Sequence, residues 1–285
     1  MANKAIHLVA EMQDAANGIA VVAKLLYQND IGAEGEVWIH STWTPDVIYL
    51  CLKALIQGKQ VVRMPHGNLA PVRLKYHGLR KGFVAPIERF LFRHSSKIIA
   101  TCEAERNWIK AFVGFRCPPI EILDLKQFFK LNNCSLGLTS ISKNRPLHLL
   151  YLGRRHPLKG IEFLEQAVRE LLADNDHNKK LDAELKIVSN AFGAEKEKVW
   201  DWCDVLVLPT LSENFGLVVA EALERGKRVI TTDGAPAWEQ EIRETLEKDV
   251  WEGYNGRLLY LKGYRDGERE KRVELLKRAI ELLVR

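Results

Sequence analysis

The sequence has no apolar run long enough to cross a membrane as a helix. Its first residues, Met1-Ala2-Asn3-Lys4, lack the apolar core of a secretory signal peptide. Its five cysteines are odd in number and show no metal-site spacing; they are Cys51, Cys102, Cys117, Cys134 and Cys203. These absences argue against a secreted, disulfide-stapled domain, so we expect a cytoplasmic protein with reduced thiols.

Two further absences narrow the function. No Gly-x-Gly-x-x-Gly follows an expected strand, which disfavours a nicotinamide-dependent dehydrogenase. Acids are scarce between Lys53 and Arg116, where thirteen Lys and Arg stand against three Glu, a net charge of +10 in a chain of +5. Residues 83–93 mix these cations with aromatic side chains, which suits a helix at an anionic membrane; a core-facing helix with a basic outer face explains them equally well. No nucleic-acid motif accompanies the charge, so nucleic acid is a poor candidate partner.

What is present is the pattern of an α/β protein. The chain has 285 residues, 47% of them hydrophobic and 28% charged, enough for two lobes that each bury a core. In the first half we expect strands at Ala5–Val9, Val37–His40, Val61–Met64, Ile98–Ala100 and Ile120–Leu123. Helices are expected between them at Ile19–Tyr27, Pro45–Ile56, Ala85–Phe92 and Glu103–Phe112. Such alternation predicts a doubly wound parallel sheet.

A polar, aperiodic stretch near residues 132–146 divides the chain, and the alternation then restarts. We expect an N-terminal Rossmann-like domain over residues 1–142 and a C-terminal one over 143–285. The strands expected in the second half are Leu147–Leu152, Leu185–Val188, Val205–Leu208, Val229–Thr232 and Arg257–Tyr260. A last helix is expected from Arg269 to Leu283.

The most informative stretch is Ser212–Leu223, in which Glu213 and Glu221 stand eight residues apart. The strand before it puts Glu213 at the carboxyl end of a buried strand, where open α/β sheets bind ligands. A helix is expected from Leu217 to Arg225, so Glu221 lies about two turns from Glu213. The free N–H groups at the start of that helix suit a phosphate.

Together with Gly153-Arg154 and Lys159-Gly160 after the first strand of the second half, this stretch resembles the retaining glycosyltransferases of family 4, also called glycosyltransferase group 1. Their shared pattern is a glutamate, seven residues and a second glutamate, with Phe-Gly after the first. The resemblance implies the GT-B fold: two doubly wound Rossmann-like lobes facing a cleft, with the donor in the second lobe. In that family the last helix often packs back on the first lobe.

The resemblance also implies roles for the second-lobe residues. Arg154 and Lys159 would neutralise the donor's diphosphate, Glu213 would contact hydroxyls of the donor sugar, and Glu221 would accept hydrogen bonds from the ribose. Further donor contacts are expected from Asn214, Phe215, Gly216 and Leu217. An ordinary basic loop and solvated glutamates are the plain alternatives. The segment that would grip the base is shortened here, and Phe192 is either a base-stacking side chain or part of the core.

In the first lobe, His66 follows an expected strand, where family members often place His-Gly near the donor sugar. His66 would hydrogen-bond the sugar or help to stabilise charge, although a lone histidine is usually structural. Gly67, Asn68 and Glu103 are expected to line the acceptor side, and Glu103 fits a plain helix-start acid equally well. Gly18 resembles the family's glycine loop, with Asn17 in place of a first glycine.

These residues predict a retaining hexosyltransferase of the EC 2.4 class that needs neither metal nor cofactor. Its donor would be a UDP- or GDP-linked sugar, and its acceptor a glycan or glycolipid of a cell-surface polysaccharide or lipopolysaccharide. The protein would then be cytoplasmic and possibly peripheral on the inner face of the membrane. The alternatives are a non-catalytic nucleotide-sugar-binding module and a GT-B sugar-nucleotide epimerase. The second would need further acid–base carboxylates, of which we see no separate set.

Overall fold

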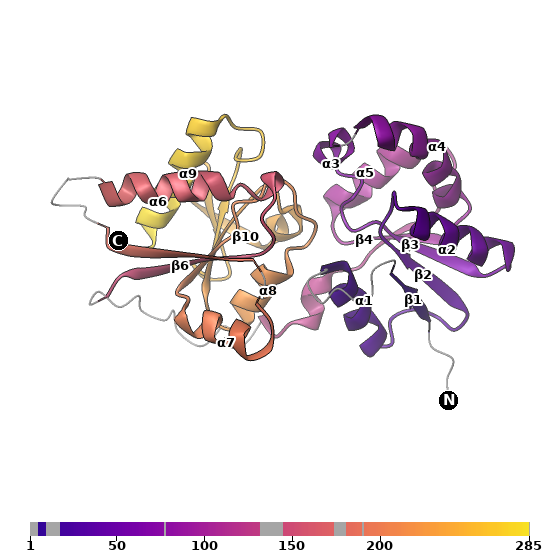
Figure 1. Ribbon diagram of the computed structural model, residues 1–285, viewed down its shortest axis with the longest axis horizontal. Coiled ribbons are helices and arrows are strands. Elements are labelled where there is room, and N and C mark those ends of the chain that lie inside the picture. The colour runs from indigo at the N-terminus through magenta and orange to yellow at the C-terminus, as the bar shows by residue number, and fades with distance from the viewer. Residues whose placement is uncertain are drawn as a thin grey trace. The chain divides into compact units, whose positions relative to one another are not determined.

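The computed structural model describes residues 5–9, 18–76, 78–131, 145–173, 181–189 and 191–284. The chain forms two compact units, Met1–Phe128 and Phe129–Arg285 (Figure 1). The boundary predicted between residues 142 and 143 lies outside the described residues and stays a prediction.

Unit 1 is built on a parallel sheet of five strands. They lie in chain order, and their bounds are β1 (Ile6–Leu8), β2 (Glu36–His40), β3 (Gln60–Met64), β4 (Lys97–Ala100) and β5 (Ile120–Ile122). All five predicted strands are therefore confirmed to within one or two residues. Buried apolar side chains of β2, β3 and β4 form the core against the helices.

Four of the five α-helices in the described residues of unit 1 were predicted. They are α1 (Gly18–Gln28), α2 (Pro45–Ile56), α4 (Gly78–Arg93) and α5 (Glu103–Val113), while α3 (Pro71–Lys75) was not expected. Helix α2 has its predicted bounds, because Thr44 Oγ1 accepts from the Val47 N–H at 3.4 Å and Pro45 takes the first position. Helix α4 begins seven residues before its predicted start. Gly78, Gly82 and Pro86 are poor helix formers and conceal its first half.

Unit 2 holds a mixed sheet of seven strands in the order β10-β11-β12-β9-β8-β6-β7. Its parallel part has the strands β6 (Leu147–Leu152), β7 (Ala183–Val188), β8 (Val205–Val207), β9 (Arg228–Thr232) and β12 (Leu258–Leu261), as predicted. The antiparallel strands β10 (Ile242–Glu247) and β11 (Val250–Gly253) were not predicted. A short 3₁₀ turn at Leu125–Phe128 closes unit 1, and another at Pro236–Glu241 precedes β10.

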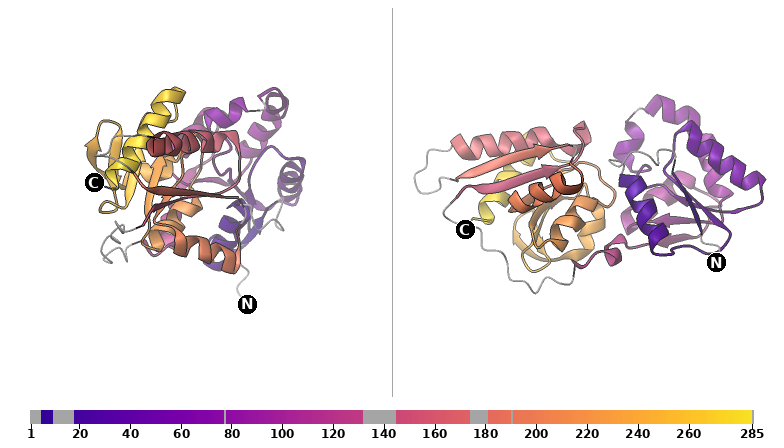
Figure 2. Two further views of the ribbon diagram at one scale, coloured as in Figure 1. Left: turned by 60° about the vertical axis from the view of Figure 1, so that its left-hand side comes forward. Right: turned by 60° about the horizontal axis from the view of Figure 1, so that its bottom comes forward.

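Helices cover both faces of this sheet (Figures 1 and 2). Helices α6 (Ile161–Ala173) and α9 (Arg269–Leu282) pack side by side on one face, and α7 (Gly193–Trp202) and α8 (Leu217–Glu224) lie on the other. Arg269 and Lys277 of α9 contact Gln166 and Glu170 of α6. Helix α9 thus packs within its own unit, and its packing on the first lobe stays a prediction.

Candidate functional site

The strand order of unit 2 reverses at β6, which has β7 on one side and β8 on the other. At such a switch point the connections leave in opposite directions and open a crevice at the carboxyl ends of the strands. Arg154 and Lys159 follow β6, and Glu213 follows β8. The fold thus brings together the two motifs that stand about sixty residues apart in the sequence.

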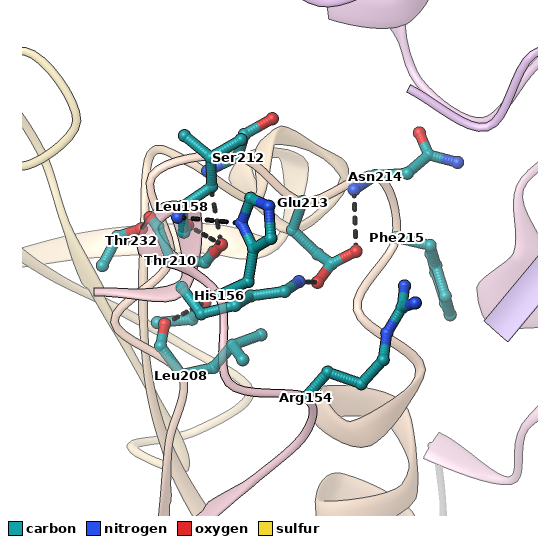
Figure 3. A network of polar contacts seen from close by, with 12 residues as sticks. Arg154, His156, Leu158, Leu208, Thr210, Ser212, Glu213, Asn214, Phe215 and Thr232 are labelled. Atoms are coloured by element: carbon teal, nitrogen blue, oxygen red, sulfur yellow. Dashed lines mark hydrogen bonds and ion pairs between the residues drawn. The ribbon is translucent and has the colours of Figure 1, made fainter. Parts of the chain in front are cut away.

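Backbone contacts fix these two loops against each other. The Leu211 N–H donates to the Leu158 carbonyl at 2.8 Å, and the Thr210 hydroxyl donates to the same oxygen at 3.1 Å (Figure 3). Gly160 has φ +63°, and a Cβ there would lie 2.2 Å from the Pro209 carbonyl oxygen. Only a glycine at position 160 allows this close approach, so Gly160 is required for the packing of the two loops.

The Lys159 ammonium forms an ion pair with the Glu213 carboxylate across the two loops. The other oxygen of Glu213 accepts from the Asn214 N–H at 3.1 Å (Figure 3). Both charged side chains are partly buried, at 16% and 20% exposure. The contact holds a cation and a carboxylate side by side at the mouth of the switch point.

Arg154 differs from its neighbour Arg155 in its contacts. The Tyr151 hydroxyl donates to the Arg154 carbonyl at 2.9 Å and fixes the backbone. Among the residues that the structure describes, the Arg154 guanidinium has no polar partner, whereas Arg155 pairs with Glu165 at 3.8 Å. Figure 3 shows the Arg154 side chain on the same side of the loops as the Glu213 carboxylate. Arg154 is therefore exposed and available for an anion.

The segment after Glu213 is buried and leads into α8. Asn214 and Phe215 are 7% and 3% exposed, and the Trp238 indole N–H donates to the Phe215 carbonyl at 2.5 Å. Gly216 takes the N-cap position in the left-handed region, at φ +71°, where no side chain caps the helix. The Val219 N–H donates to the Gly216 carbonyl at 2.9 Å, so the N–H groups of Leu217 and Val218 remain for a ligand.

Glu221 lies in the second turn of α8 and pairs with Lys196 of α7 at 2.7 Å. Sequence reasoning missed Lys196. The sequence feature that could have indicated Lys196 is its place in the first turn of the helix after β7, the strand next to β6. Phe192, at the start of the same helix, is 48% exposed and is therefore not a core residue.

A third loop, after β9, supports Glu213 through backbone contacts. The Glu213 N–H donates to the Gly234 carbonyl at 2.8 Å, and the Thr232 hydroxyl donates to the Thr210 carbonyl at 2.5 Å. A Cβ on Gly234 would lie 2.1 Å from the Thr210 carbonyl oxygen. The segment that follows β9 thus positions the loop that carries Glu213.

His66 is buried at 5% exposure, with φ +53°, and its Nε2 lies 2.8 Å from His40 Nδ1. Burial lowers the pKa of His66 to about 3, so the ring is neutral at pH 7. The Gly67 N–H donates to the buried Glu105 carboxylate at 2.5 Å. The Asn68 amide donates to the Ser41 hydroxyl at 3.1 Å. The backbone around His66 is therefore fixed from two sides.

Glu103 is exposed and pairs with Arg106 one turn along α5, the contact expected of a plain helix-start acid. Glu105, two residues on, is the acid that reaches the His66 loop, and sequence reasoning missed it. Its carboxylate also accepts from the Thr101 N–H at 2.8 Å. Gly18 is the first residue of α1, and Asn17 before it lies outside the described residues. The acceptor-side roles of Gly67, Asn68 and Glu103 stay predictions.

Two absences hold for the described part of the chain. It contains no group of three or more His, Cys, Asp or Glu arranged to hold a metal ion, and no helix there is long and apolar enough to span a membrane. The sequence also has an Asp-x-Asp at Asp174–Asp176, outside the described residues. Independence from metal therefore stays a prediction.

Comparison with known proteins identifies the kind of domain. Residues 146–252 match the family described as "Glycosyl transferases group 1". No curated protein sequence matches the chain. Among solved structures, sucrose-phosphate synthase from Thermosynechococcus elongatus is similar at 18% identity and a TM-score of 0.59, over 93% of this chain and 68% of that one.

Two trehalose enzymes are similar as well. An α,α-trehalose 6-phosphate synthase from Burkholderia multivorans gives 9% identity and a TM-score of 0.56, over 93% of this chain and 69% of that one. An Escherichia coli structure described as trehalose-6-phosphate bound with UDP-2-fluoro glucose gives 11% identity and a TM-score of 0.53, over 91% and 69%. The chain thus spans about two thirds of the length of these proteins.

The fold is that of the GT-B glycosyltransferases, which confirms the predicted fold class. The match to the group 1 glycosyltransferase family over residues 146–252 contains the motifs at Arg154, Lys159, Glu213 and Glu221, from which that family was predicted.

Proposed function

We propose that this protein is a retaining glycosyltransferase that moves a sugar from a UDP- or GDP-linked donor to a glycan or glycolipid acceptor. The observation that carries the proposal is the Lys159–Glu213 pair at the switch point of unit 2, with Arg154 exposed beside it. It supplies cations for a diphosphate and a carboxylate for sugar hydroxyls within one short stretch of surface.

The donor's diphosphate would contact Arg154, Lys159 and the N–H groups at the start of α8. An ammonium has three hydrogens, so Lys159 can keep Glu213 and still donate to a phosphate oxygen. Each charge-assisted contact is worth about 1.5–3 kcal/mol. These positive groups would stabilise the charge that develops on the leaving nucleotide, with no metal ion required.

The rest of the donor would lie along α8 and α7. Glu213 would accept from hydroxyls of the sugar and Glu221 from the ribose diol, since a carboxylate can accept two hydrogen bonds at once. Lys196 already holds Glu221 in position. The half-exposed Phe192 ring, four residues before Lys196, would contact the base.

Reaction with retention would take place on one face of the sugar, with the departing phosphate oxygen taking the acceptor's proton. The protein then supplies position and charge more than acid–base chemistry. For His66 we propose a hydrogen bond to a substrate hydroxyl. This is the role that the family resemblance implies.

The test is the melting temperature of the whole chain against a panel of nucleoside diphosphates and their sugars. A ligand at about a hundred times its dissociation constant stabilises by roughly 2.7 kcal/mol. Selective stabilisation by one nucleotide, followed by its release in turnover, supports the proposal. An unchanged melting temperature with every compound of the panel contradicts the proposal. Binding without turnover would favour a non-catalytic module.

We further propose that the acceptor lies at an anionic membrane surface, as a lipopolysaccharide or polysaccharide precursor would on the cytoplasmic side. The support comes from the outward face of α4. Four of its apolar side chains are exposed at helical spacing: Leu79 (88%), Phe83 (85%), Ile87 (46%) and Phe90 (50%). Arg80 and Arg93 are exposed and flank this stripe at helical spacing.

The same helix has no exposed acid, because its one carboxylate, Glu88, is buried against Arg63 at 2.9 Å. An exposed apolar stripe between cations suits the headgroup region of an anionic bilayer. The plain alternative, a core-facing helix with a basic outer face, leaves the exposed Leu79 and Phe83 unexplained.

Sedimentation with lipid vesicles tests this contact. The wild type should bind vesicles of phosphatidylcholine with phosphatidylglycerol, and this binding should weaken as the salt concentration rises. It should bind vesicles of pure phosphatidylcholine poorly. The double change Phe83→Ser with Phe90→Ser should lose binding. Phe115→Ser, at an aromatic that is 82% exposed outside α4, is the matched control and should bind normally. Equal binding by the double variant would contradict the proposal.

A further inference from the structure

Three histidines lie in a row across the first three strands of unit 1. His7 comes from β1, His40 ends β2 and His66 follows β3. All are buried, at 9%, 0% and 5% exposure. Their ring planes are inclined by 32° for His7 and His40 and by 26° for His40 and His66, with centroids 5.3 Å and 5.1 Å apart. Neighbouring parallel strands thus place the three imidazole rings in one row, which we call the histidine relay.

Hydrogen bonds connect the rings end to end. His7 Nε2 lies 3.0 Å from the Ile31 carbonyl oxygen, and His7 Nδ1 lies 3.0 Å from His40 Nε2. His40 Nδ1 then lies 2.8 Å from His66 Nε2. Every nitrogen of His7 and His40 is used, and His66 contributes one of its two.

The Ile31 carbonyl at one end determines which ring nitrogen carries the proton in each of the three histidines. A carbonyl oxygen only accepts, so His7 must carry its proton on Nε2, and its Nδ1 is an acceptor when the ring is neutral. His40 must then donate from Nε2 and accept at Nδ1. His66 must therefore donate from Nε2, which leaves Nδ1 of His66 with a lone pair and no hydrogen.

This assignment requires neutral rings, and the surroundings keep them so. Burial lowers the pKa of His7 and of His66, and the pKa of His40 falls well below its ordinary value through burial and its two histidine neighbours. The charge of Glu36 raises the pKa of His7, but burial has the larger effect and the pKa is lowered overall. The Glu36 carboxylate already accepts from the Trp38 indole at 2.8 Å and pairs with Lys97 at 3.1 Å.

We propose that His7 and His40 are positioning residues that fix His66 in its Nε2–H tautomer, so that His66 presents only an acceptor nitrogen to the substrate. That nitrogen would accept from a sugar hydroxyl and would repel a phosphate or carboxylate oxygen, which needs a donor. The inference rests on the proposed function only for the identity of the hydroxyl. The tautomer itself follows from the unliganded protein.

Backbone contacts hold the same ring in place. His66 and Gly67 both take left-handed φ values, +53° and +73°. The Gly67 N–H is bound by Glu105, whose second oxygen is held by Thr101. The histidine relay and the buried Glu105 carboxylate therefore fix both the orientation and the proton position of the His66 ring. A histidine with only a packing role would not require both.

Long-range ¹H–¹⁵N spectra of the ¹⁵N-labelled full chain without ligand test the relay. His7→Gln, His40→Gln and His66→Gln variants assign the three signals. We expect protonated Nε2 and unprotonated Nδ1 in all three rings at pH 7. A protonated Nδ1 on His66, or a doubly protonated ring, overturns the proposal whether or not the protein transfers sugar.

Two variants connect the relay to turnover. His40→Leu should leave His66 as a mixture of tautomers and lower kcat/KM about tenfold, the worth of one hydrogen bond, with an unchanged Kd for the nucleoside diphosphate. His40→Gln can still accept from His66 and should retain most activity. His94→Gln, at an exposed histidine just after α4, is the control. Equal kcat/KM in His40→Leu and the wild type, with His66 still in one tautomer, would overturn the positioning role.

Discussion

Glu213 makes two kinds of contact at once. One oxygen pairs with Lys159 and the other accepts from the Asn214 N–H, so the carboxylate is held at the edge of the site. In a donor complex it would have to serve the sugar as well, and a carboxylate has lone pairs for several donors. The residue is therefore oriented before any ligand arrives.

Replacing Glu213 should separate function from stability. We expect Glu213→Ala to lower sugar transfer about a hundredfold or more, because two charge-assisted hydrogen bonds are lost. Its free energy of unfolding should change by about 1 kcal/mol or less, since the pair with Lys159 is partly exposed. Rates of nucleotide release and urea unfolding curves check both. Near-normal transfer would remove Glu213 from the site.

The buried histidines predict how stability depends on pH. The pKa of His66 is about 3 in the folded protein, against about 6.5 for an unperturbed histidine, and the pKa values of His7 and His40 are lowered too. The unfolded chain therefore binds more protons below pH 6.5, so stability should fall as pH drops from 6.5 toward 3.

Urea unfolding at pH 7 and pH 5 measures this slope. Buried acids such as Glu105, whose pKa is raised by burial, oppose it, so the comparison must be made between variants. His66→Gln should lose less stability than the wild type between the two pH values, whereas His94→Gln should behave as the wild type does. Identical slopes in His66→Gln and the wild type would mean that His66 is not buried in its neutral form.

Individual residues could be predicted only where a motif marks them. Arg154, Lys159, Glu213 and Glu221 were found because their spacing is a family pattern. Lys196, Glu105 and His40 were missed because their partners are determined by strand order, which brings together residues 25 to 38 positions apart. Nothing in the local sequence of a lysine or histidine reports such a neighbour.

At the scale of elements, the glycine loops hold the site together. Gly160 and Gly58 share left-handed φ values of +63° and +66°, but only Gly160 has a backbone oxygen within 2.2 Å of an added Cβ. Gly58→Ala should cost about 1 kcal/mol for its conformation alone. Gly160→Ala should cost about 2–4 kcal/mol and lower transfer, because the Lys159 loop must move away from Pro209.

Urea unfolding of both variants checks this difference. Equal losses in Gly160→Ala and Gly58→Ala would show that the close approach between the loops after β6 and β8 does not hold. A large loss in Gly160→Ala with unchanged transfer would show instead that the approach serves stability alone.

Elements were predictable where one physical signal dominates. Helix α2 has its predicted bounds because a cap, an N1 proline and a C-terminal glycine agree. The first half of α4 was missed because its outward side is apolar and its sequence holds Gly78, Gly82 and Pro86. The β10–β11 hairpin was missed because Ile242–Glu247 is mostly polar, so alternation of apolar residues does not mark it.

At the scale of the whole molecule, the chemistry is divided between the units. Unit 2 carries the reversal of strand order and the Lys159–Glu213 pair, where we propose that the nucleotide sugar binds. Unit 1 carries the whole net charge of +5 and the histidine relay. The fold class followed from the alternation of strands and helices. The division at Phe128 and Phe129 did not, because no change of composition marks those residues.

The proposed donor site is tested by the Kd of the nucleoside diphosphate that stabilises the protein best. Calorimetry measures this Kd in the wild type and in the double variant Arg154→Ala with Lys159→Ala. Two lost charge-assisted contacts of about 1.5–3 kcal/mol each should weaken binding by about a hundredfold or more. Arg155→Ala, at the neighbouring arginine paired with Glu165, should bind as the wild type does. An unchanged Kd in the double variant would contradict a donor site at the switch point of unit 2.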